Sequence, residues 1–154
     1  MRKKVDTLLE RLLITVSIIM LIAVVLQVIS RYIFNSPTTF TDEIASFSLI
    51  WLGLLGAAYA SGKELHLAID LIPESTVKKS PRFFYGFVTF FVMLFAFLVM
   101  VVGGFRLCYL TWELGQKSAV LKIPLAVIYI VLPLSGLLIL FYSLDSYNRK
   151  IKSL

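Results

Sequence analysis

The sequence predicts an all-α integral membrane protein with four transmembrane helices, and three observations favour this fold class. Of the 154 residues, 59% are hydrophobic and only 16% are charged, whereas an ordinary soluble domain contains about 25% charged residues. The mean hydropathy is +0.91. Four uncharged runs, at 12–30, 44–62, 83–105 and 123–144, make up more than half of the chain. Too few polar residues remain for the surface of a soluble domain, so the composition also argues against a disordered chain and a disulfide scaffold.

Each uncharged run is long enough to cross a membrane. A bilayer core about 30 Å thick requires about 20 helical residues, and a helix is needed because backbone polar groups in lipid must bond within their own segment. We predict transmembrane helices at about 9–31, 42–62, 83–106 and 123–144, within one four-helix domain covering residues 1–154. The first run exceeds the apolar core of a secretory signal, which favours a helix that is retained.

The basic residues predict the orientation of these helices. An even number of spans places both termini on one side, and that side would carry eleven of the fifteen Lys and Arg residues. Because Lys and Arg are enriched in cytoplasmic loops, we expect both termini in the cytoplasm. The net charge of +6 is distributed between and beyond the apolar runs, which suits contact with the lipid bilayer and not with nucleic acid.

The loop between the second and third spans contains a mixed segment. His66 and Asp70 are four residues apart within an otherwise apolar stretch, so they share one face if the stretch is helical. This pattern predicts a short amphipathic helix lying along the cytoplasmic interface. A structural role for His66, capping or pairing with Asp70, is the simpler interpretation, and a switching or ligand role is the alternative.

Several residues indicate how the spans begin and bend. Thr39 precedes Asp42 and Glu43, an arrangement typical of an N-cap followed by acidic residues in the first helical turn. Pro124 suits the first turn of the fourth span, where its missing N–H loses no hydrogen bond. Pro133 falls near the middle of that span and is expected to kink the helix.

The spans contain almost no residues that could carry out chemistry. Ionisable groups within a membrane usually have a function, and the four runs contain no acidic or basic residue. One histidine and one cysteine, Cys108, cannot supply the ligands of a haem or metal site. No group of side chains resembles a catalytic triad. We therefore predict a protein that is not an enzyme and that has no cofactor, no metal and no catalytic residue.

The second span carries a face of small residues beside a tryptophan. Gly53, Ala57 and Ser61 are spaced four residues apart, Gly56 and Ala60 form a second row beside them, and Trp51 lies next to both. Small residues at this spacing allow two helices to approach closely in a membrane. The face could receive another helix of the same chain or a separate partner protein, and the sequence favours neither.

In their order and spacing, these pieces resemble a known family: the small membrane subunit, of the DctQ type, of tripartite ATP-independent periplasmic (TRAP) transporters. The matching pieces are RYIFNSP at 31–37, TDE at 41–43, WLGLLGA at 51–57, HLAID at 66–70, KIP at 122–124 and LPL at 132–134. The resemblance extends over nearly the whole chain.

The resemblance implies a role as a non-catalytic small permease subunit in the inner membrane of a bacterium. In such systems a periplasmic substrate-binding protein captures an organic acid, of the carboxylate or sialic acid type, and a large membrane subunit imports it by sodium symport. The small subunit would act as a scaffold for the large subunit and would help to dock the binding protein. Arg31, Asp42 and Glu43, expected at the outer face, could contact the binding protein or pair among themselves.

Two other functions are compatible with four spans. A stand-alone small exporter of the multidrug type would need a membrane-embedded carboxylate, for which Glu10 is the one candidate. A membrane anchor subunit of a respiratory enzyme would bind quinone or haem. The scarcity of ionisable residues and of histidine makes both less favourable than the scaffold.

Overall fold

The computed structural model of the protein describes residues 2–35, 38–63 and 81–153, and all of its regular elements are helices. Their order is α1 (Arg2–Tyr32), α2 (Thr39–Gly62), α4 (Pro81–Phe95), a π-helix η1 (Ala96–Gly103), α5 (Gly104–Glu113), α6 (Leu125–Tyr129) and α7 (Val131–Ser153). In the described part of the chain, four stretches are long and apolar enough to span a membrane: Arg2–Tyr32, Thr39–Gly62, Gly86–Glu113 and Leu125–Arg149. The prediction of an all-α protein with four such helices is confirmed. The predicted interfacial helix, with His66 and Asp70, lies outside the described residues.

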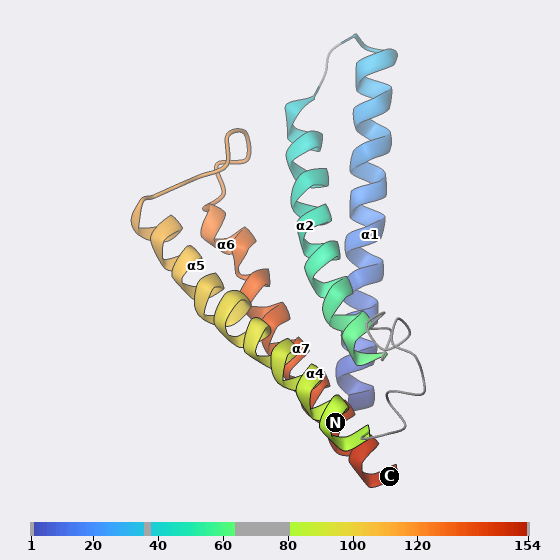
Figure 1. The fold of residues 1–154 in the computed structure, drawn as a ribbon. Helices are drawn as coiled ribbons and strands as arrows, with labels where there is room; N and C mark the ends of the chain where they lie inside the picture. The colour runs from blue at the N-terminus through green and yellow to red at the C-terminus, as the bar shows by residue number, and fades with distance from the viewer. Residues whose placement is uncertain (1, 36–37, 64–80, 154) are drawn as a thin grey trace.

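The helices form two hairpins that meet at one end and diverge at the other (Figure 1). One hairpin consists of α1 and α2, and the other pairs the α4–η1–α5 rod with α6 and α7. The start of α1 and the end of α7 lie together at the narrow end. The connection between α5 and α6 lies at the wide end, as do the end of α1 and the start of α2.

Helix α7 is the centre of the packing. It contacts α2, α4 and η1, and 39% of the apolar window of its span is buried, compared with 6% for α1. The core cluster at the junction of α1, α2 and α7 is built on Leu55, Val131 and Tyr142, all with 0% exposure. Most of α1 therefore faces away from the chain, where lipid or another protein can cover it.

Two of the closest helix contacts are made by glycines on different elements from the predicted face. A Cβ on Gly136 of α7 would lie 2.8 Å from the Cβ of Met100 in η1, and one on Gly104 would lie 2.9 Å from Cδ of Pro133. These distances are shorter than side chains tolerate, so both sites require glycine. The absence of a side chain lets the rod containing η1 lie directly against α7.

The third and fourth spans depart from regular α-helix. In the third, Ala96–Gly103 form a π-helix, a rare geometry that the sequence analysis did not predict. In the fourth, the chain is interrupted at Ile130, between α6 and α7 and three residues before Pro133. Pro124 is the N-cap of α6 and precedes its first turn. The sequence predicts a kink at Pro133, and the interruption between α6 and α7 lies close to that residue.

Helix boundaries differ modestly from the sequence-based ones. Helix α1 already begins at Arg2, well before the predicted span, because hydropathy marks the hydrocarbon-embedded part of a helix and not its polar extension. Helix α2 begins at Thr39, three residues before the predicted span, and its N-cap is Thr38, one residue before the expected cap at Thr39. The hydroxyl of Thr41 donates to the Thr38 carbonyl oxygen at 2.9 Å, which closes the first turn.

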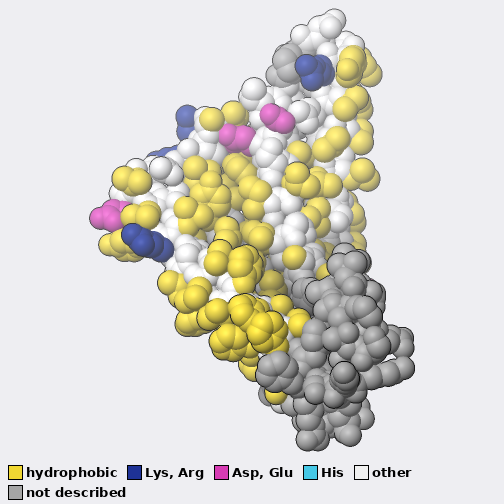
Figure 2. Space-filling view, in the orientation of Figure 1, with side chains coloured by type: hydrophobic (Ala, Val, Ile, Leu, Met, Phe, Trp, Pro, Cys, Tyr) yellow, Lys and Arg dark blue, Asp and Glu magenta, His cyan; other side chains and the backbone are white. Residues whose placement is uncertain are grey.

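The surface is largely apolar. On the face shown in Figure 2, hydrophobic side chains cover the middle, and charged side chains lie toward the upper and left edges. Exposed large hydrophobic residues occur on all four spans, among them Ile18, Leu49, Phe97 and Leu137. A belt of this kind is expected where lipid replaces water as the solvent.

Candidate functional site

The small-residue face of α2 is open in this chain. A Cβ built on Gly53 or on Gly56 would meet nothing within 4 Å. Gly53 and Ala57 are exposed, and Gly56 and Ala60 are half-buried. None of the other described helices fills this face, so it remains available to a helix from another protein.

Trp51 belongs to the interior and not to this open face. Its indole N–H donates to the carbonyl oxygen of Ile128 at 3.2 Å, and its ring packs against the core cluster of α1, α2 and α7. The bond joins α2 to α6 just before the interruption at Ile130. Trp51 therefore holds the two hairpins together, and its place beside the glycines in the sequence does not make it part of the same surface.

At the wide end, Glu43 holds the loop 114–124 against α2, and we call this loop the outer loop for its place at the wide end of the molecule. Its carboxylate accepts hydrogen bonds at 2.9 Å from the backbone N–H of Val120, the N–H of Leu121 and the hydroxyl of Ser118. Hydrogen bonds to an ionised acceptor are stronger than those between neutral groups. We call these three contacts the Glu43 clip, and they join the two hairpins where the helices have diverged.

The outer loop has a defined internal structure. Lys117 and Pro124 form an isolated antiparallel bridge, and the N–H of Ser118 donates to the carbonyl oxygen of Ile123 at 2.9 Å. Gly115 and Lys122 have positive φ angles of 60° and 57°, which turn the chain sharply at both ends of the segment. The loop thus has internal contacts of its own, in addition to the Glu43 clip that attaches it to α2.

The other two predicted docking residues have different surroundings. Asp42 accepts a hydrogen bond from the side-chain amide of Gln27 at 3.0 Å, which links α2 to α1. Arg31 is exposed near the end of α1. Among the described residues, neither Asp42 nor Glu43 forms an ion pair with Arg31. The structure therefore brings the three residues to one end of the molecule without joining them to one another.

A second polar network closes the narrow end. The guanidinium of Arg2 bonds to the Asp145 carboxylate at 2.6 Å and to the Gly62 carbonyl oxygen. The hydroxyl of Tyr142 donates to Asp6 at 2.6 Å, and Arg149 pairs with Asp145. We call these residues the Arg2 network, and they connect α1, α2 and α7 at one point.

The sequence analysis did not find the Arg2 network or the Glu43 clip. From the sequence, Arg2 is one of the basic residues whose distribution predicts the orientation. A usable signal was present: both ends of a four-span chain lie on the same side, so opposite charges near its termini can pair. The partners of Glu43, by contrast, are mostly backbone N–H groups, which no side-chain pattern reveals.

No cluster of three or more His, Cys, Asp or Glu residues that could hold a metal occurs among the residues that the structure describes. What the described geometry offers is a helical frame with an open small-residue face and an ordered loop at its wide end. Such a frame is suited to binding other proteins.

Comparison with known proteins decides the family. The model of the DctQ component of tripartite ATP-independent periplasmic transporters matches residues 20–153. The chain belongs to this family. It is therefore a TRAP transporter small permease subunit, a transporter component and a multi-pass inner-membrane protein.

Two relatives from Haemophilus influenzae agree with this assignment. The small permease subunit is 30% identical over 134 residues to a protein named as a TRAP transporter small permease protein, with 85% of this chain and 80% of that protein covered. It is also 31% identical over 77 residues to the sialic acid TRAP transporter permease protein SiaT. That match covers 50% of this chain and 12% of SiaT, so a similar segment occurs within a much longer permease protein.

Proposed function

We propose that this small permease subunit is a non-catalytic scaffold for the large membrane subunit of its transporter, and that it helps to dock a periplasmic substrate-binding protein. The transporter would import an organic acid, of the carboxylate or sialic acid type, by sodium symport. Both termini would be cytoplasmic, and the loop held by the Glu43 clip would face the periplasm.

The single observation that carries the scaffold role is the open face around Gly53 and Gly56. Inside the chain, glycines at helix contacts are filled by a neighbour: the ring of Tyr142 covers Gly62, and η1 covers Gly136. The two glycines in the middle of α2 have no such neighbour. Because close packing of small residues drives helix association in lipid, this face is our candidate for contact with the large subunit.

The match to SiaT supports a large permease protein as the partner. A segment similar to half of this chain forms 12% of that protein, so a similar sequence is joined there to additional permease sequence. The name of SiaT supports an organic acid as cargo, and the substrate of the present transporter belongs to the proposal.

The docking role is confined to the wide end. Glu43 is committed to the outer loop, so we assign it to shaping the docking surface. Arg31 is exposed and Asp42 is exposed beside Gln27, which leaves both able to meet charged groups of a binding protein. Exposed charges of this kind mainly set the rate and specificity of association.

Purification of a tagged small subunit co-expressed with its large subunit tests the scaffold. Replacing Gly56 by Leu places a bulky side chain on the open face and should remove the large subunit from the purified material. The matched control is Gly103→Leu, since Gly103 is exposed and a Cβ there would lie 3.7 Å from a carbonyl oxygen of its own helix. Retention of the large subunit by both Gly56→Leu and Gly53→Leu would refute this interface.

Uptake measurements test the docking role separately. Reversing the charge of Arg31 and Asp42 should lower uptake at limiting binding protein while the large subunit still co-purifies. Lys63, which is exposed and lies just beyond the other end of α2, provides a charge-reversal control. Unchanged uptake with the Arg31 and Asp42 variants would remove these residues from the docking surface.

A further inference from the structure

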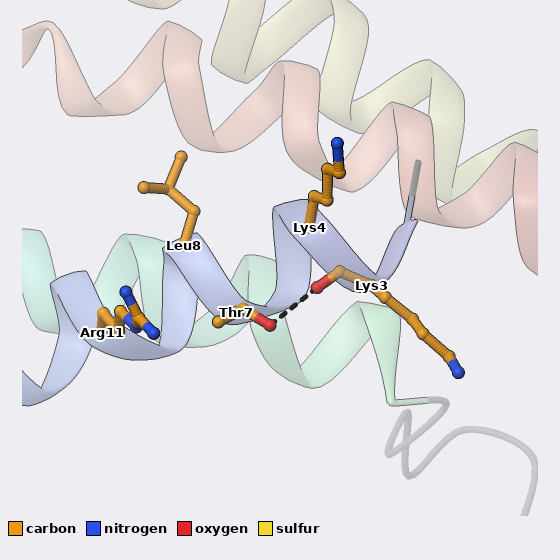
Figure 3. A pocket seen from close by; sticks show the side chains of 5 residues that line it. All are labelled: Lys3, Lys4, Thr7, Leu8 and Arg11. Atoms are coloured by element: carbon orange, nitrogen blue, oxygen red, sulfur yellow. Dashed lines mark hydrogen bonds between the residues drawn. The ribbon is translucent and has the colours of Figure 1, made fainter.

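A hollow of about 400 Å³ lies along the first turns of α1. Lys3, Lys4, Thr7, Leu8 and Arg11 line it. Figure 3 shows all five side chains on this one helix, with Lys4 and Leu8 projecting to the same side and Lys3 extending in another direction. The hydroxyl of Thr7 donates a hydrogen bond to the Lys3 carbonyl oxygen at 2.8 Å, within the helix. The charged groups that line the hollow are therefore the side chains of Lys3, Lys4 and Arg11.

These three cations differ from their neighbour Arg2. Arg2 points into the chain and bonds to Asp145 and to the Gly62 carbonyl oxygen. Lys3, Lys4 and Arg11 are exposed and have no ion-pair partner among the described residues. The hollow therefore holds three positive charges that the described part of the chain leaves uncompensated.

The carboxylates on the same helix do not neutralise the hollow. Asp6 belongs to the Arg2 network, where its carboxylate accepts a hydrogen bond from the Tyr142 hydroxyl. Its Oδ2 lies 3.7 Å from Nε of Arg2. Glu10 is exposed beside Arg11 in the sequence and forms no ion pair with it. The ligand that suits this hollow is an anion.

An apolar track continues from the basic cluster along the same face. Leu8 is 69% exposed between the cations, and further along the helix Ile18 and Ile22 are 53% and 54% exposed. Ile18 and Ile22 follow Arg11 by seven and eleven residues, which places them on its face. The cations thus stand at one end of a membrane-spanning apolar surface, at the depth of lipid headgroups.

We propose that this face of α1 is a binding site for an anionic phospholipid. The phosphate lies among Lys3, Lys4 and Arg11, and an acyl chain lies along Leu8, Ile18 and Ile22. Each basic side chain near a membrane surface strengthens attraction to anionic lipid, and an alkyl chain matches the apolar track, which a soluble phosphate compound would leave uncovered. This site is separate from the face of α2 and does not rest on the proposed function.

Native mass spectrometry of the full-length chain, purified in detergent with whatever partner accompanies it, tests the site. Phosphatidylglycerol should bind more tightly than phosphatidylcholine with the same acyl chains. The K3Q/K4Q/R11Q variant should bind phosphatidylglycerol about tenfold more weakly or worse, because three attractive charges are removed. The R31Q/K117Q/K122Q variant removes three charges outside this site and should bind phosphatidylglycerol as tightly as the unmodified chain does.

Two further variants separate the site from a general charge effect. K3R/K4R keeps the charge and should retain binding, whereas L8N should weaken the binding of phosphatidylglycerol while leaving all three cations in place. Inorganic phosphate should not displace the lipid. Equal losses in the two charge-removal variants, an absence of preference for phosphatidylglycerol, or full displacement by inorganic phosphate would each overturn the proposal.

Discussion

The hydroxyl of Tyr142 donates a hydrogen bond to the carboxylate of Asp6 at 2.6 Å, joining residues that are 136 positions apart in the sequence. Tyr142 has 0% exposure, and the guanidinium carbon of Arg2 lies 5.8 Å from the centroid of its ring. One side chain of α7 thus combines a hydrogen bond, a cation–π contact and core packing. Through it, the last helix of the chain is fixed to the first.

Removing that hydroxyl should weaken the protein measurably. In Tyr142→Phe the ring still fills the core, but Asp6 loses its short hydrogen bond and keeps only Arg2 nearby. We expect a loss of about 1–2 kcal/mol, since bonds to charged groups contribute more than neutral ones. The free energy of unfolding in detergent, measured by SDS titration, reports it. Tyr109→Phe, at a tyrosine that is 66% exposed, should change little, and equal losses in the two variants would contradict the assigned role.

A methyl group at Gly62 should be more disruptive than one at Gly53. A Cβ on Gly62 would lie 2.8 Å from two ring carbons of Tyr142, and this ring is fully buried. Overpacking of this kind costs about 1–3 kcal/mol. Gly53→Ala meets no atom and should be neutral or slightly stabilising, because alanine favours the helix. The same titration compares the two variants, and a Gly62→Ala protein as stable as Gly53→Ala would show that the contact is looser than described.

Neutralising Glu43 should release the outer loop. Glu43→Gln keeps the size of the side chain but removes the charge that three donors share. Hydrogen exchange at the amides of Val120 and Leu121 should accelerate about tenfold or more, since bonds to an ionised acceptor contribute about 1.5–3 kcal/mol. Asp42→Asn serves as the control because Asp42 bonds to Gln27 and not to the loop. Unaltered exchange at both amides would mean that the loop is held by its own turn structure alone.

The indole of Trp51 should contribute through a single hydrogen bond. Trp51→Phe retains an aromatic ring against the core and leaves the Ile128 carbonyl oxygen without its indole donor. A loss of about 0.5–1.5 kcal/mol in unfolding free energy is expected. Trp112→Phe is the matched substitution, because Trp112 is 66% exposed. If Trp112→Phe were the more damaging change, the bond across α2 and α6 would not be a significant support.

Hydrophobic patterning predicted the four spans because it reports the one constraint that lipid imposes on every residue of a crossing helix. It predicted the small-residue face of α2 for a similar reason, since glycine spacing is visible in the sequence. Packing decides which glycine of the chain has a neighbour: a Cβ on Gly62 or Gly136 would meet another side chain, and one on Gly53 would meet nothing within 4 Å. The sequence alone shows no difference between these three positions.

The π-helix and the outer loop were beyond reach for physical reasons. Residues 96–103 are as apolar as an ordinary α-helical span, so hydropathy cannot reveal their different hydrogen-bonding pattern. Glu43 was predicted near the outer face, but its bonds to Val120 and Leu121 depend on how a distant loop folds. Local sequence signals placed the N-cap of α2 to within one residue, at Thr39 where the structure has Thr38, because the capping group and the helix are adjacent in the chain.

The Glu43 clip and the Arg2 network lie at opposite ends of the two hairpins, and this placement has a mechanical consequence. A hinge needs one end free to swing, yet here a rotation about either end stretches the bonds at the other. Bending the two hairpins apart would break short hydrogen bonds to charged groups before the apolar side chains of α2 and α7 began to slide past one another. The four spans should therefore move as one rigid body under a force in the plane of the membrane.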